Sequence, residues 1–303
     1  MTSKEFSLGL SISGHGVQAV ELERGTSSGV LHAIDEWENK FPFDGGKEAE
    51  LESRASQEFQ EYLQAFLKVN HVKATQVAVA LDTALLFLNT LPVEDGTPRP
   101  QITEIIEWEL RQYFPELQPK EFITDVHVMS AHREQGWNEL LAVSILRRHT
   151  TAIRQALKTL GLTLHIVDVD HFSADMALRV NYPDTYRRYL ALVGVKENRL
   201  DVSLMKNGTL QSYSYVTVQS DQEIVDQIAT LSRETKGIYS VTVYGPHLDK
   251  DLLVQIRRGS ALLVEALNPL RHISVSDSLR LADHLSVPSY RFASAVGVAL
   301  RRD

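Results

Sequence analysis

The sequence predicts an α/β protein made of two similar halves, and three observations support this prediction. Both halves open with strand-like segments joined by short turns, at residues 8–23 and again at 189–216. In each half, helical patterns then follow and alternate with short apolar segments of the kind that form buried strands. A turn-rich stretch at 181–184 separates the two. This repeated order is typical of a duplicated α/β unit, with a ligand crevice between the halves.

Length and composition fit an ordinary globular protein. The chain has 303 residues, of which 43% are hydrophobic and 23% charged, and its formal net charge is −8. This acidic balance disfavours nucleic acid or anionic lipid as the partner of the chain as a whole. The chain has no cysteine, which excludes disulfides, thiolate nucleophiles and cysteine zinc sites. No apolar stretch reaches the ~18 residues of a membrane-spanning helix, so we expect a cytoplasmic protein without direct membrane insertion.

The first half is expected to hold a sheet, helices packed on it and a small insertion. Alternating apolar residues predict strands, and apolar residues three and four positions apart predict helices. The expected elements are strands at 8–13, 17–23 and 29–37, a helix at 47–69, strands at 76–81 and 84–91, a loop at 92–100, a helix at 101–114, strands at 122–130 and 138–146, a helix at 147–160, a strand at 162–170 and a helix at 171–180.

The second half repeats the opening of the first and is shorter. The segment at 189–216 predicts three strands, with Asn207-Gly208 as a tight turn between the last two. A helix at 221–235 and a strand at 238–245 follow. We therefore divide the chain into one unit over 1–184 and a second over 185–303.

The order of these segments resembles the PilM-like proteins of type IV pilus assembly, which have the actin-like ATPase fold and are related to FtsA. The resemblance lies in LGLSISGHGVQAVEL from residue 8, VAVALDTALLFLNTLPV from 77, EIIEWELRQYFP from 104, LAVSILRRHTTAIRQALKTLGLTLHIVDVDHFSADMAL from 141 and RFASAVGVALRR from 291. It implies an α/β fold of two duplicated ribonuclease H-like (actin-like) domains. It also implies a small α/β subdomain inserted in the first domain at about 92–146, and a reduced second domain.

The resemblance also points to the first turn of a nucleotide site, where this chain departs from the family pattern. Ser11 stands at the position of an acid, Ser13 at that of a glycine and Gln18 at that of a basic residue. A serine hydroxyl cannot replace the carboxylate that orders the hydration shell of Mg²⁺. Gly14 and Gly16 leave room for a phosphate one residue later, so the loop is weakened rather than closed.

The other nucleotide-site positions depart further from the family pattern. Gly194 stands where the second acid belongs and Lys196 where a glycine belongs, and only Gly245 remains of the small residues of the adenosine turn. Asp168 and Asp170 match the segment that links the two domains, in which a water-positioning acid can lie. We therefore expect a vestigial nucleotide site without catalysis, and neither ATP nor Mg²⁺ as a cofactor.

Asp168, Asp170 and His171 form a further group with the chemistry of metal ligands. In a continuous strand, Asp168 and Asp170 would share one face and His171 would lie on the other, which makes joint coordination unfavourable. We interpret the group as the end of a strand and the start of a helix, and expect no metal site.

For function, the resemblance implies a binding partner. In PilM-like proteins, the groove beside the inserted subdomain receives the N-terminal cytoplasmic peptide of PilN, a membrane-anchored protein. Trp108, Tyr113 and Phe114 lie in this subdomain and are the expected partner-binding residues. The residue pattern alone favours the core of the subdomain for at least two of them.

We therefore expect a non-catalytic cytoplasmic scaffold of a type IV pilus or type II secretion-like inner-membrane platform. A PilN-like bitopic partner would hold it at the membrane. Two alternatives stay open: an ATP-binding switch of the same machinery, and the cytoplasmic part of GspL, a reduced relative that continues into a membrane helix. Self-association also stays open, since some actin-like families polymerise.

Overall fold

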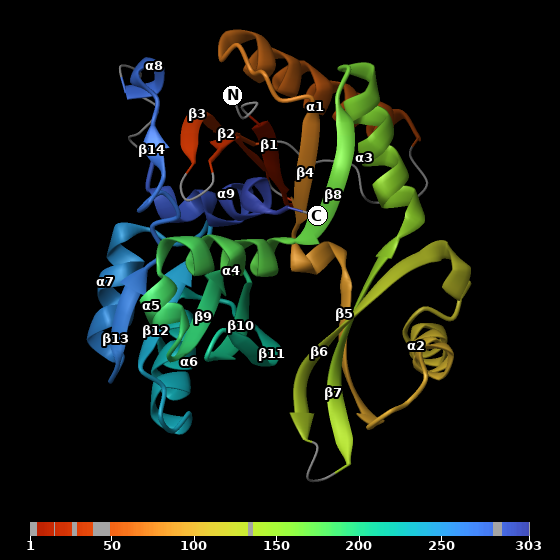
Figure 1. The fold of residues 1–303 in the computed structure, drawn as a ribbon, viewed down its shortest axis with the longest axis vertical. Helices are drawn as coiled ribbons and strands as arrows, with labels where there is room; N and C mark the ends of the chain where they lie inside the picture. The colour runs from red at the N-terminus through yellow and green to blue at the C-terminus, as the bar shows by residue number, and fades with distance from the viewer. Residues whose placement is uncertain are drawn as a thin grey trace.

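Three sheets organise the chain in the computed structural model, which describes residues 5–14, 16–25, 29–38, 49–132, 136–280 and 287–302. Two sheets form the cores of two lobes, one above the other in Figure 1, and the third belongs to a subdomain beside the second lobe. The chain is α/β, as predicted. Within these described ranges, no helix has both the length and the apolar character needed to cross a membrane.

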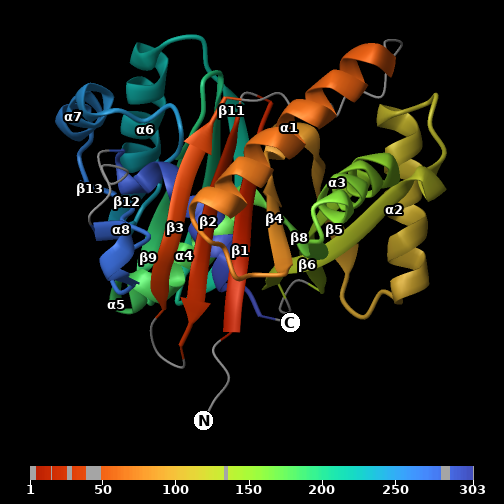
Figure 2. The ribbon, with the colours of Figure 1, turned by 90° about the horizontal axis from the view of Figure 1, so that it is seen from above.

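The first sheet has six strands in the order β14-β3-β2-β1-β4-β8. They are β1 (Glu5–Ile12), β2 (Val17–Arg24), β3 (Val30–Trp37), β4 (Gln76–Leu81), β8 (Thr163–Val169) and β14 (Ser274–Val275). Helices α1 (Ala49–Val69) and α3 (Arg147–Thr159) cover one face, and α1 crosses the strands diagonally in Figure 2. The predicted start of α1 at residue 47 lies outside the described residues.

Strand β4 is buried on both faces, which explains its continuous apolar sequence. Val77 and Val79 pack in the core that α1 and α3 form with the sheet. Ala78 and Ala80 face the other way, where they contact Val298 of helix α9 (Ala293–Leu300). The small residues on this second face let a helix lie close to the sheet.

The second sheet has five strands in the order β11-β10-β9-β12-β13. They are β9 (Tyr189–Val195), β10 (Arg199–Lys206), β11 (Thr209–Thr217), β12 (Ser240–Tyr244) and β13 (Leu263–Ala266). Helices α6 (Asp221–Glu234) and α7 (Lys250–Gly259) pack on one face, and α4 (Asp170–Asn181) with α5 (Pro183–Tyr186) on the other. Asn207 and Gly208 both have positive φ, 52° and 75°, which confirms the predicted tight turn.

The inserted subdomain begins earlier than the predicted residue 92. Its sheet, in the order β5-β7-β6, contains β5 (Phe87–Glu94), β6 (Phe122–His132) and β7 (Trp137–Leu146), and α2 (Arg99–Tyr113) packs on it. The predicted strand at 84–91 is wrong at its start. Asp82 accepts a hydrogen bond from the backbone N–H of Ala84 at 3.0 Å and begins a 3₁₀ turn, Thr83–Leu85, instead.

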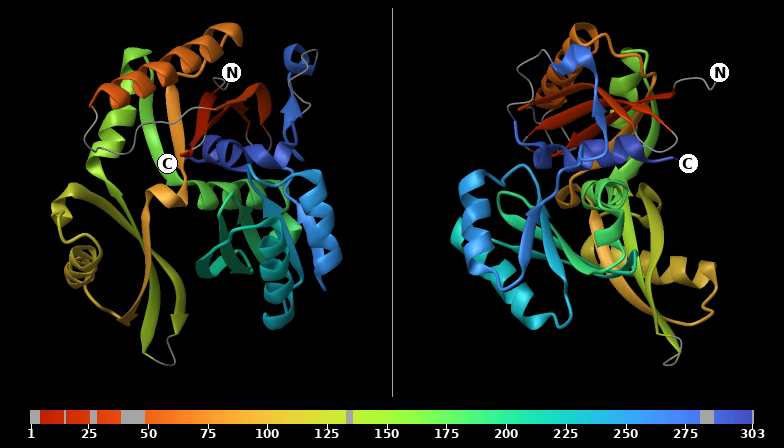
Figure 3. Two further views of the ribbon diagram at one scale, coloured as in Figure 1. Left: turned by 180° about the vertical axis from the view of Figure 1, so that it is seen from behind. Right: turned by 60° about the vertical axis from the view of Figure 1, so that its left-hand side comes forward.

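Helices α4 and α9 lie side by side between the two lobes (Figures 1 and 3). Glycine makes this contact possible, because a Cβ at Gly297 would collide with the backbone of Ser173 in α4. On the opposite side of α9, a Cβ at Gly9 in β1 would collide with the backbone of Ala295. Glycine therefore lets the backbone of α9 lie close to the backbones of α4 and β1.

The C-terminal part of the predicted second unit, 185–303, returns to the first lobe. Strand β14 pairs with β3, and α9 covers the face of the first sheet that α1 leaves open. The chain between them contains α8 (Asp277–Arg280) and the 3₁₀ turn Ser289–Phe292. Sequence position alone did not indicate this return, because the two halves are joined by packing between elements far apart in the chain.

Candidate functional site

A cavity of about 1030 Å³ lies between the lobes, at the carboxyl ends of β1, β4, β9 and β12. Open α/β sheets bind ligands at such strand ends. Six of the eight residues predicted for the vestigial nucleotide site line the cavity: Ser11, Ser13, Gln18, Gly194, Lys196 and Gly245. Gly14 and Asp168 are not among its lining residues.

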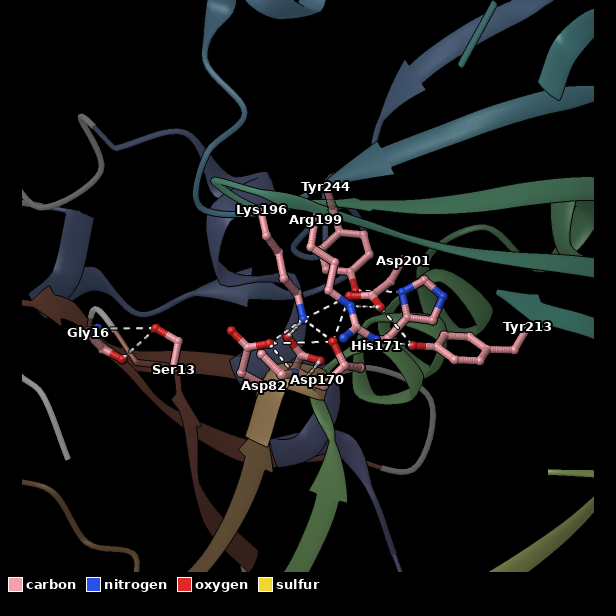
Figure 4. Close-up of polar contacts among 12 residues, drawn as sticks. Ser13, Gly16, Asp82, Asp170, His171, Lys196, Arg199, Asp201, Tyr213 and Tyr244 are labelled. Carbon is pink, nitrogen blue, oxygen red and sulfur yellow. Dashed lines mark hydrogen bonds and ion pairs between the residues drawn. The ribbon is translucent and has the colours of Figure 1, made fainter. Parts of the chain in front are cut away.

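The ammonium group of Lys196 is the centre of a polar cluster beside this cavity (Figure 4). Its Nζ lies 2.6 Å from Asp82 Oδ1, 2.8 Å from Asp170 Oδ2 and 2.9 Å from Asp201 Oδ2. It also donates to Thr83 Oγ1 at 2.6 Å. Asp82 and Thr83 follow β4 in the first lobe, whereas Lys196 and Asp201 belong to the β9–β10 hairpin of the second. The ammonium therefore joins the two lobes from within.

Asp201 extends the cluster deeper into the second lobe. Its side chain is fully buried. It accepts hydrogen bonds from Thr83 Oγ1 at 2.8 Å, Arg199 Nε at 2.9 Å and Tyr213 OH at 2.7 Å. The cluster thus combines three carboxylates with two cations, and its hydrogen bonds satisfy groups that would be costly to bury alone.

The charges in this cluster follow from burial and proximity. Burial raises the pKa of Asp170 to about 7, although the nearby Lys196 acts in the opposite direction. Burial by itself would lower the pKa of Lys196, but the attraction of Asp170, Asp82 and Asp201 outweighs it and raises that pKa above its usual value. The ammonium is therefore charged at neutral pH, and Asp170 is the carboxylate that takes up a proton near pH 7.

The first turn uses its own backbone groups. Ser13 N donates to Gly16 O at 3.0 Å, and Gly16 N donates to the Ser13 hydroxyl at 3.1 Å. A phosphate loop needs such N–H groups to point at the anion. Gln18, further along, donates to Glu36 at 3.4 Å rather than supplying a positive charge.

Gly194 stands where the family pattern has the second acid of the nucleotide site, and buried polar side chains occupy the space beside it. A Cβ at Gly194 would lie 2.8 Å from the hydroxyl of Tyr244 and 3.3 Å from Nδ1 of His171. Tyr244 OH and His171 Nδ1 are 2.9 Å apart, and His171 Nε2 is 2.8 Å from Ser203 Oγ. Burial lowers the pKa of His171 to about 4, so the ring is neutral at pH 7.

The far wall of the cavity holds a second contact between the lobes. Gly245 has φ +133°, and a Cβ there would collide with the backbone of Val195, so glycine is required by the close approach of two chain segments. The next residue, Pro246, accepts a hydrogen bond from Arg291 at 2.5 Å, and Arg291 also pairs with Glu36 of β3 at 3.2 Å. Arg291 thus links β3 to the turn after β12.

Asp168 lies outside the cavity, unlike its predicted place in the nucleotide site. Strand β8 ends at Val169 and α4 begins at Asp170, which confirms the interpretation of this group as the end of a strand and the start of a helix. Asp168 pairs with Arg301 and accepts a hydrogen bond from Ser173 Oγ at 2.8 Å, whereas Asp170 pairs with Lys196. Over the part of the chain that the structure describes, no group of three or more acidic or histidine side chains is arranged to hold a metal ion.

Two of the three predicted partner-binding residues are exposed. Trp108 is 56% exposed and Tyr113 60% exposed, on the outside of the inserted subdomain. The ring of Phe114 packs between Phe87 and Phe122, with centroid distances of 5.4 and 5.3 Å. Only Phe114 belongs to the subdomain core, so the interpretation that at least two of them do is wrong.

The reason for this exposure is the orientation of α2. Ile106 and Leu110 occupy its buried positions, which leaves Trp108 on the outer side. A shallow hollow of about 420 Å³ is lined by Gln101, Glu104, Ile105 and Trp108.

Sequence reasoning missed three members of the lysine cluster: Asp82, Thr83 and Asp201. Asp82 directly follows the buried strand β4, a position that places a side chain at the ligand-binding edge of a sheet. Asp201 lies within β10, on the same face as Arg199, Ser203 and Met205, and its side chain is buried. A charged residue in such a place indicates a buried partner, although the sequence does not say which one.

This arrangement does not fit a magnesium nucleotide. Mg²⁺ is bound through carboxylate oxygens and water. Here the three carboxylates that converge on one point are all bound to the ammonium of Lys196, whose charge repels a second cation. We therefore derive no reaction step through ATP or metal at this site.

Two lobes with a cleft at their strand ends, a helix pair between them and a subdomain inserted in the first lobe define the actin-like ATPase fold. Comparison with solved structures supports this assignment. No protein-family model and no curated protein sequence matches the chain.

The chain is similar to the structure of the PilM-PilN type IV pilus biogenesis complex, with a TM-score of 0.76 and 16% identity, over 99% of this chain and 98% of the other. It is also similar to a Bacteroides thetaiotaomicron protein with actin-like ATPase fold and unknown function (TM-score 0.53, 9% identity, 88% and 92% covered). A third similar structure is the cytoplasmic domain of EpsL, an inner membrane component of the type II secretion system of Vibrio cholerae (TM-score 0.49, 13% identity, 95% and 100% covered). The predicted fold and the resemblance to PilM-like proteins are confirmed.

Proposed function

We propose that this chain is a non-catalytic cytoplasmic scaffold of a type IV pilus or type II secretion-like inner-membrane platform, and that it binds the cytoplasmic tail of a membrane-anchored partner. The observation that carries the proposal is the place of Lys196. Its ammonium lies between carboxylates of both lobes, at 2.6 to 2.9 Å.

The lysine removes the need for a ligand that holds the lobes together. In a nucleotide switch, a bound metal–phosphate group supplies the charge that links the two lobes, and its loss lets them move. Here a side chain of the chain itself supplies the positive charge, so the link does not depend on ligand concentration. A surface that needs a fixed lobe arrangement is then always formed, as a scaffold requires.

The partner assignment is supported by the fold and by the inserted subdomain. The similar structure with the TM-score of 0.76 is a complex of PilM with PilN. In this chain, Trp108 and Tyr113 offer exposed aromatic area on α2, and aromatic side chains are enriched at protein interfaces. Tail binding needs no catalytic residue.

The first experiment is an isothermal titration of the purified protein with Mg-ATP, with thermal stability followed in parallel. We expect neither heat of binding nor stabilisation at millimolar ATP. Ligand at ~100 times its Kd would add about 2.7 kcal/mol to the free energy of unfolding. Saturable binding with such a stabilisation would favour the ATP-binding switch and overturn the ligand-independent scaffold.

The second experiment measures the binding of labelled N-terminal cytoplasmic peptides of PilN-like bitopic proteins by fluorescence anisotropy. We expect the double variant Trp108→Ser/Tyr113→Ser to weaken binding by ~10-fold or more, since truncation of an aromatic hot spot of an interface costs about 2 kcal/mol or more. Tyr215→Ser is the matched control, because Tyr215 is 53% exposed but lies on β11. Equal affinity of all three proteins would exclude α2 as the binding surface.

A further inference from the structure

The end of the second sheet that faces away from the cleft carries a basic and aromatic surface. Strands β9 and β12 run parallel, and their carboxyl ends lie at the cavity, so their amino ends lie roughly 20 Å away, at the opposite edge. Three turns meet there: the turn before β9, the β10–β11 hairpin and the turn before β12. We call this surface the basic end; its members are Arg187, Arg188, Tyr189, Lys206, Lys236 and Tyr239.

The register of the strands places these residues next to one another. Lys206 is the cross-strand partner of Tyr189, and Tyr239 N donates to Tyr189 O at 2.7 Å. The guanidinium of Arg188 lies over the ring of Tyr239 at 3.9 Å from its centroid, and Lys206 Nζ lies 5.8 Å from that of Tyr189. The cations and the rings thus form one continuous surface.

The charge of this surface is opposite to that of the chain. The three turns, residues 183–189, 206–209 and 233–239, hold five cations and only two acids, Asp184 and Glu234, whereas the whole chain has a net charge of −8. Arg187, Arg188, Lys206 and Lys236 are exposed, and Tyr239 is 45% exposed. Such a local reversal of charge favours an anionic partner.

We propose that the basic end contacts the headgroups of an anionic phospholipid membrane. Lysine and arginine near a bilayer are attracted by its negative surface, and tyrosine prefers the interface because its ring is apolar and its hydroxyl polar. The surface is formed by turns that project from the end of a sheet, a shape that suits a bilayer better than an extended peptide in a groove. The two cavities of about 1030 and 420 Å³ are lined by other residues.

This inference rests on the proposed function, which brings the chain to the inner membrane through a partner tail. Once the tail is bound, a weak second contact becomes effectively intramolecular and adds to the overall affinity. The basic end then also orients the chain, with the second sheet end-on to the bilayer and the cleft directed away from it.

The test is flotation of the full chain, without partner, on vesicles of phosphatidylcholine alone or with 25% phosphatidylglycerol, at low and high salt. We expect binding only to the anionic vesicles, reduced several-fold at high salt because the attraction is electrostatic. The double variant Arg188→Ser/Lys206→Ser is expected to lose most of this binding. Arg99→Ser/Lys120→Ser is the matched control, with the same change in charge on exposed positions of the inserted subdomain.

Three outcomes would overturn the inference: equal binding to both kinds of vesicle, equal loss in both double variants, or no vesicle binding together with retention on a polyglutamate column, which indicates an acidic protein partner. Tail binding is measured on the same proteins. If the double variant Arg188→Ser/Lys206→Ser loses vesicle binding but keeps tail binding, both proposals are supported. Vesicle failure with normal tail binding overturns only the membrane contact, and tail failure with normal vesicle binding overturns only the scaffold assignment.

Discussion

The two ends of the second sheet differ in burial and in what their charges contact. At the cleft end of β9, Lys196 is almost completely buried and surrounded by carboxylates of both lobes. At the basic end, Arg188 and Lys206 are exposed and lie over tyrosine rings. The same strand thus begins at a charged surface directed outward and ends at a charged cluster closed within the protein.

This difference indicates how the two sets of charges act. A buried cation that is paired with carboxylates of both lobes stabilises one arrangement of the lobes. Its removal leaves those buried carboxylates without a cation. A cation on an exposed ring contributes little to folding and is available to a partner. The expected effects of substitution therefore decrease from the cleft end to the basic end.

The largest effect is expected for Lys196→Ala. Removing the ammonium leaves three converging carboxylates without their common cation, and breaking a buried ion pair in this way costs about 3–5 kcal/mol. Urea unfolding followed by circular dichroism measures the change in the free energy of unfolding. Lys206→Ala, at the other end of the hairpin, is the control and should stay within about 0.5 kcal/mol of the wild type. Equal stability of Lys196→Ala and wild type would show that the cluster does not join the lobes.

A divalent cation should recover part of this loss. In Lys196→Ala, Asp82, Asp170 and Asp201 would face an empty centre, and carboxylate oxygens are the ligands that Mg²⁺ and Ca²⁺ prefer. We expect saturating Mg²⁺ to raise the stability of the variant by about 2–3 kcal/mol and that of the wild type by none, in thermal unfolding with and without the cation. A shift of equal size in both proteins would point to nonspecific binding elsewhere.

Gly194→Ala tests how tightly the cleft end is packed. The added methyl group would contact the Tyr244 hydroxyl and His171, and overpacking of this kind costs about 1–3 kcal/mol. In the background of Tyr244→Phe, which lacks the hydroxyl, the same substitution should cost less. A double-mutant cycle by chemical unfolding measures this difference, and a coupling free energy of zero would contradict the packing argument.

The pH dependence of stability should separate Asp170 from His171. The folded-state pKa of Asp170 is raised to about 7, so the folded protein binds more protons than the unfolded one and stability falls as pH rises from about 4 to 7. The pKa of His171 is lowered to about 4, so its contribution rises with pH between about 4 and 6.5.

In the wild type these two slopes oppose each other. In Asp170→Asn the falling slope of Asp170 is lost, while the rising slope of His171 and the falling slope of Asp175, whose pKa burial raises to about 6, both remain. Between pH 4.5 and 6.5 the stability of the variant should therefore change with pH more positively than that of the wild type, by up to about 1.4 kcal/mol per pH unit. Urea unfolding at four pH values between 4.5 and 7.5 measures both proteins. Parallel curves would contradict the assignment of a raised pKa to Asp170.

The smallest effect is expected at the basic end. Arg188→Ser/Lys206→Ser should change the free energy of unfolding by no more than about 0.5 kcal/mol per site, because both side chains are exposed. Urea unfolding of this variant, beside its flotation on vesicles, sharpens the comparison. A large loss of stability would mean that the basic end has a structural role like that of the cleft end.

Most of the elements could be predicted from the sequence because their signals are local. The apolar run at 76–81 and the Asn207-Gly208 turn give the strand and the tight turn directly. The start of β5 was missed because Leu85 and Leu86 extend the apolar pattern, whereas the side chain of Asp82 begins a 3₁₀ turn there. A hydrogen bond that one side chain accepts thus outweighs the apolar pattern.

The lysine cluster was only partly predictable. Lys196 was recognised as a departure from a family pattern, but its contact with Asp82 spans 114 residues of sequence. Such a contact depends on how the lobes pack, and the spacing of apolar residues within one helix or strand does not predict it. The position of Asp168 could not be predicted for the same reason. It depends on where β8 ends and α4 begins, and on the ion pair with Arg301.

Helix α9 has a consequence for the order in which the protein is made. It covers a face of the first sheet, and Arg24 of β2 donates to Ala299 O at 2.9 Å across 275 residues of sequence. During synthesis, Val20, Leu22, Ala78 and Ala80 therefore emerge from the ribosome long before the helix that buries them. The first lobe cannot complete its core until translation reaches α9, so the nascent chain exposes an apolar sheet face, which favours aggregation until α9 covers it.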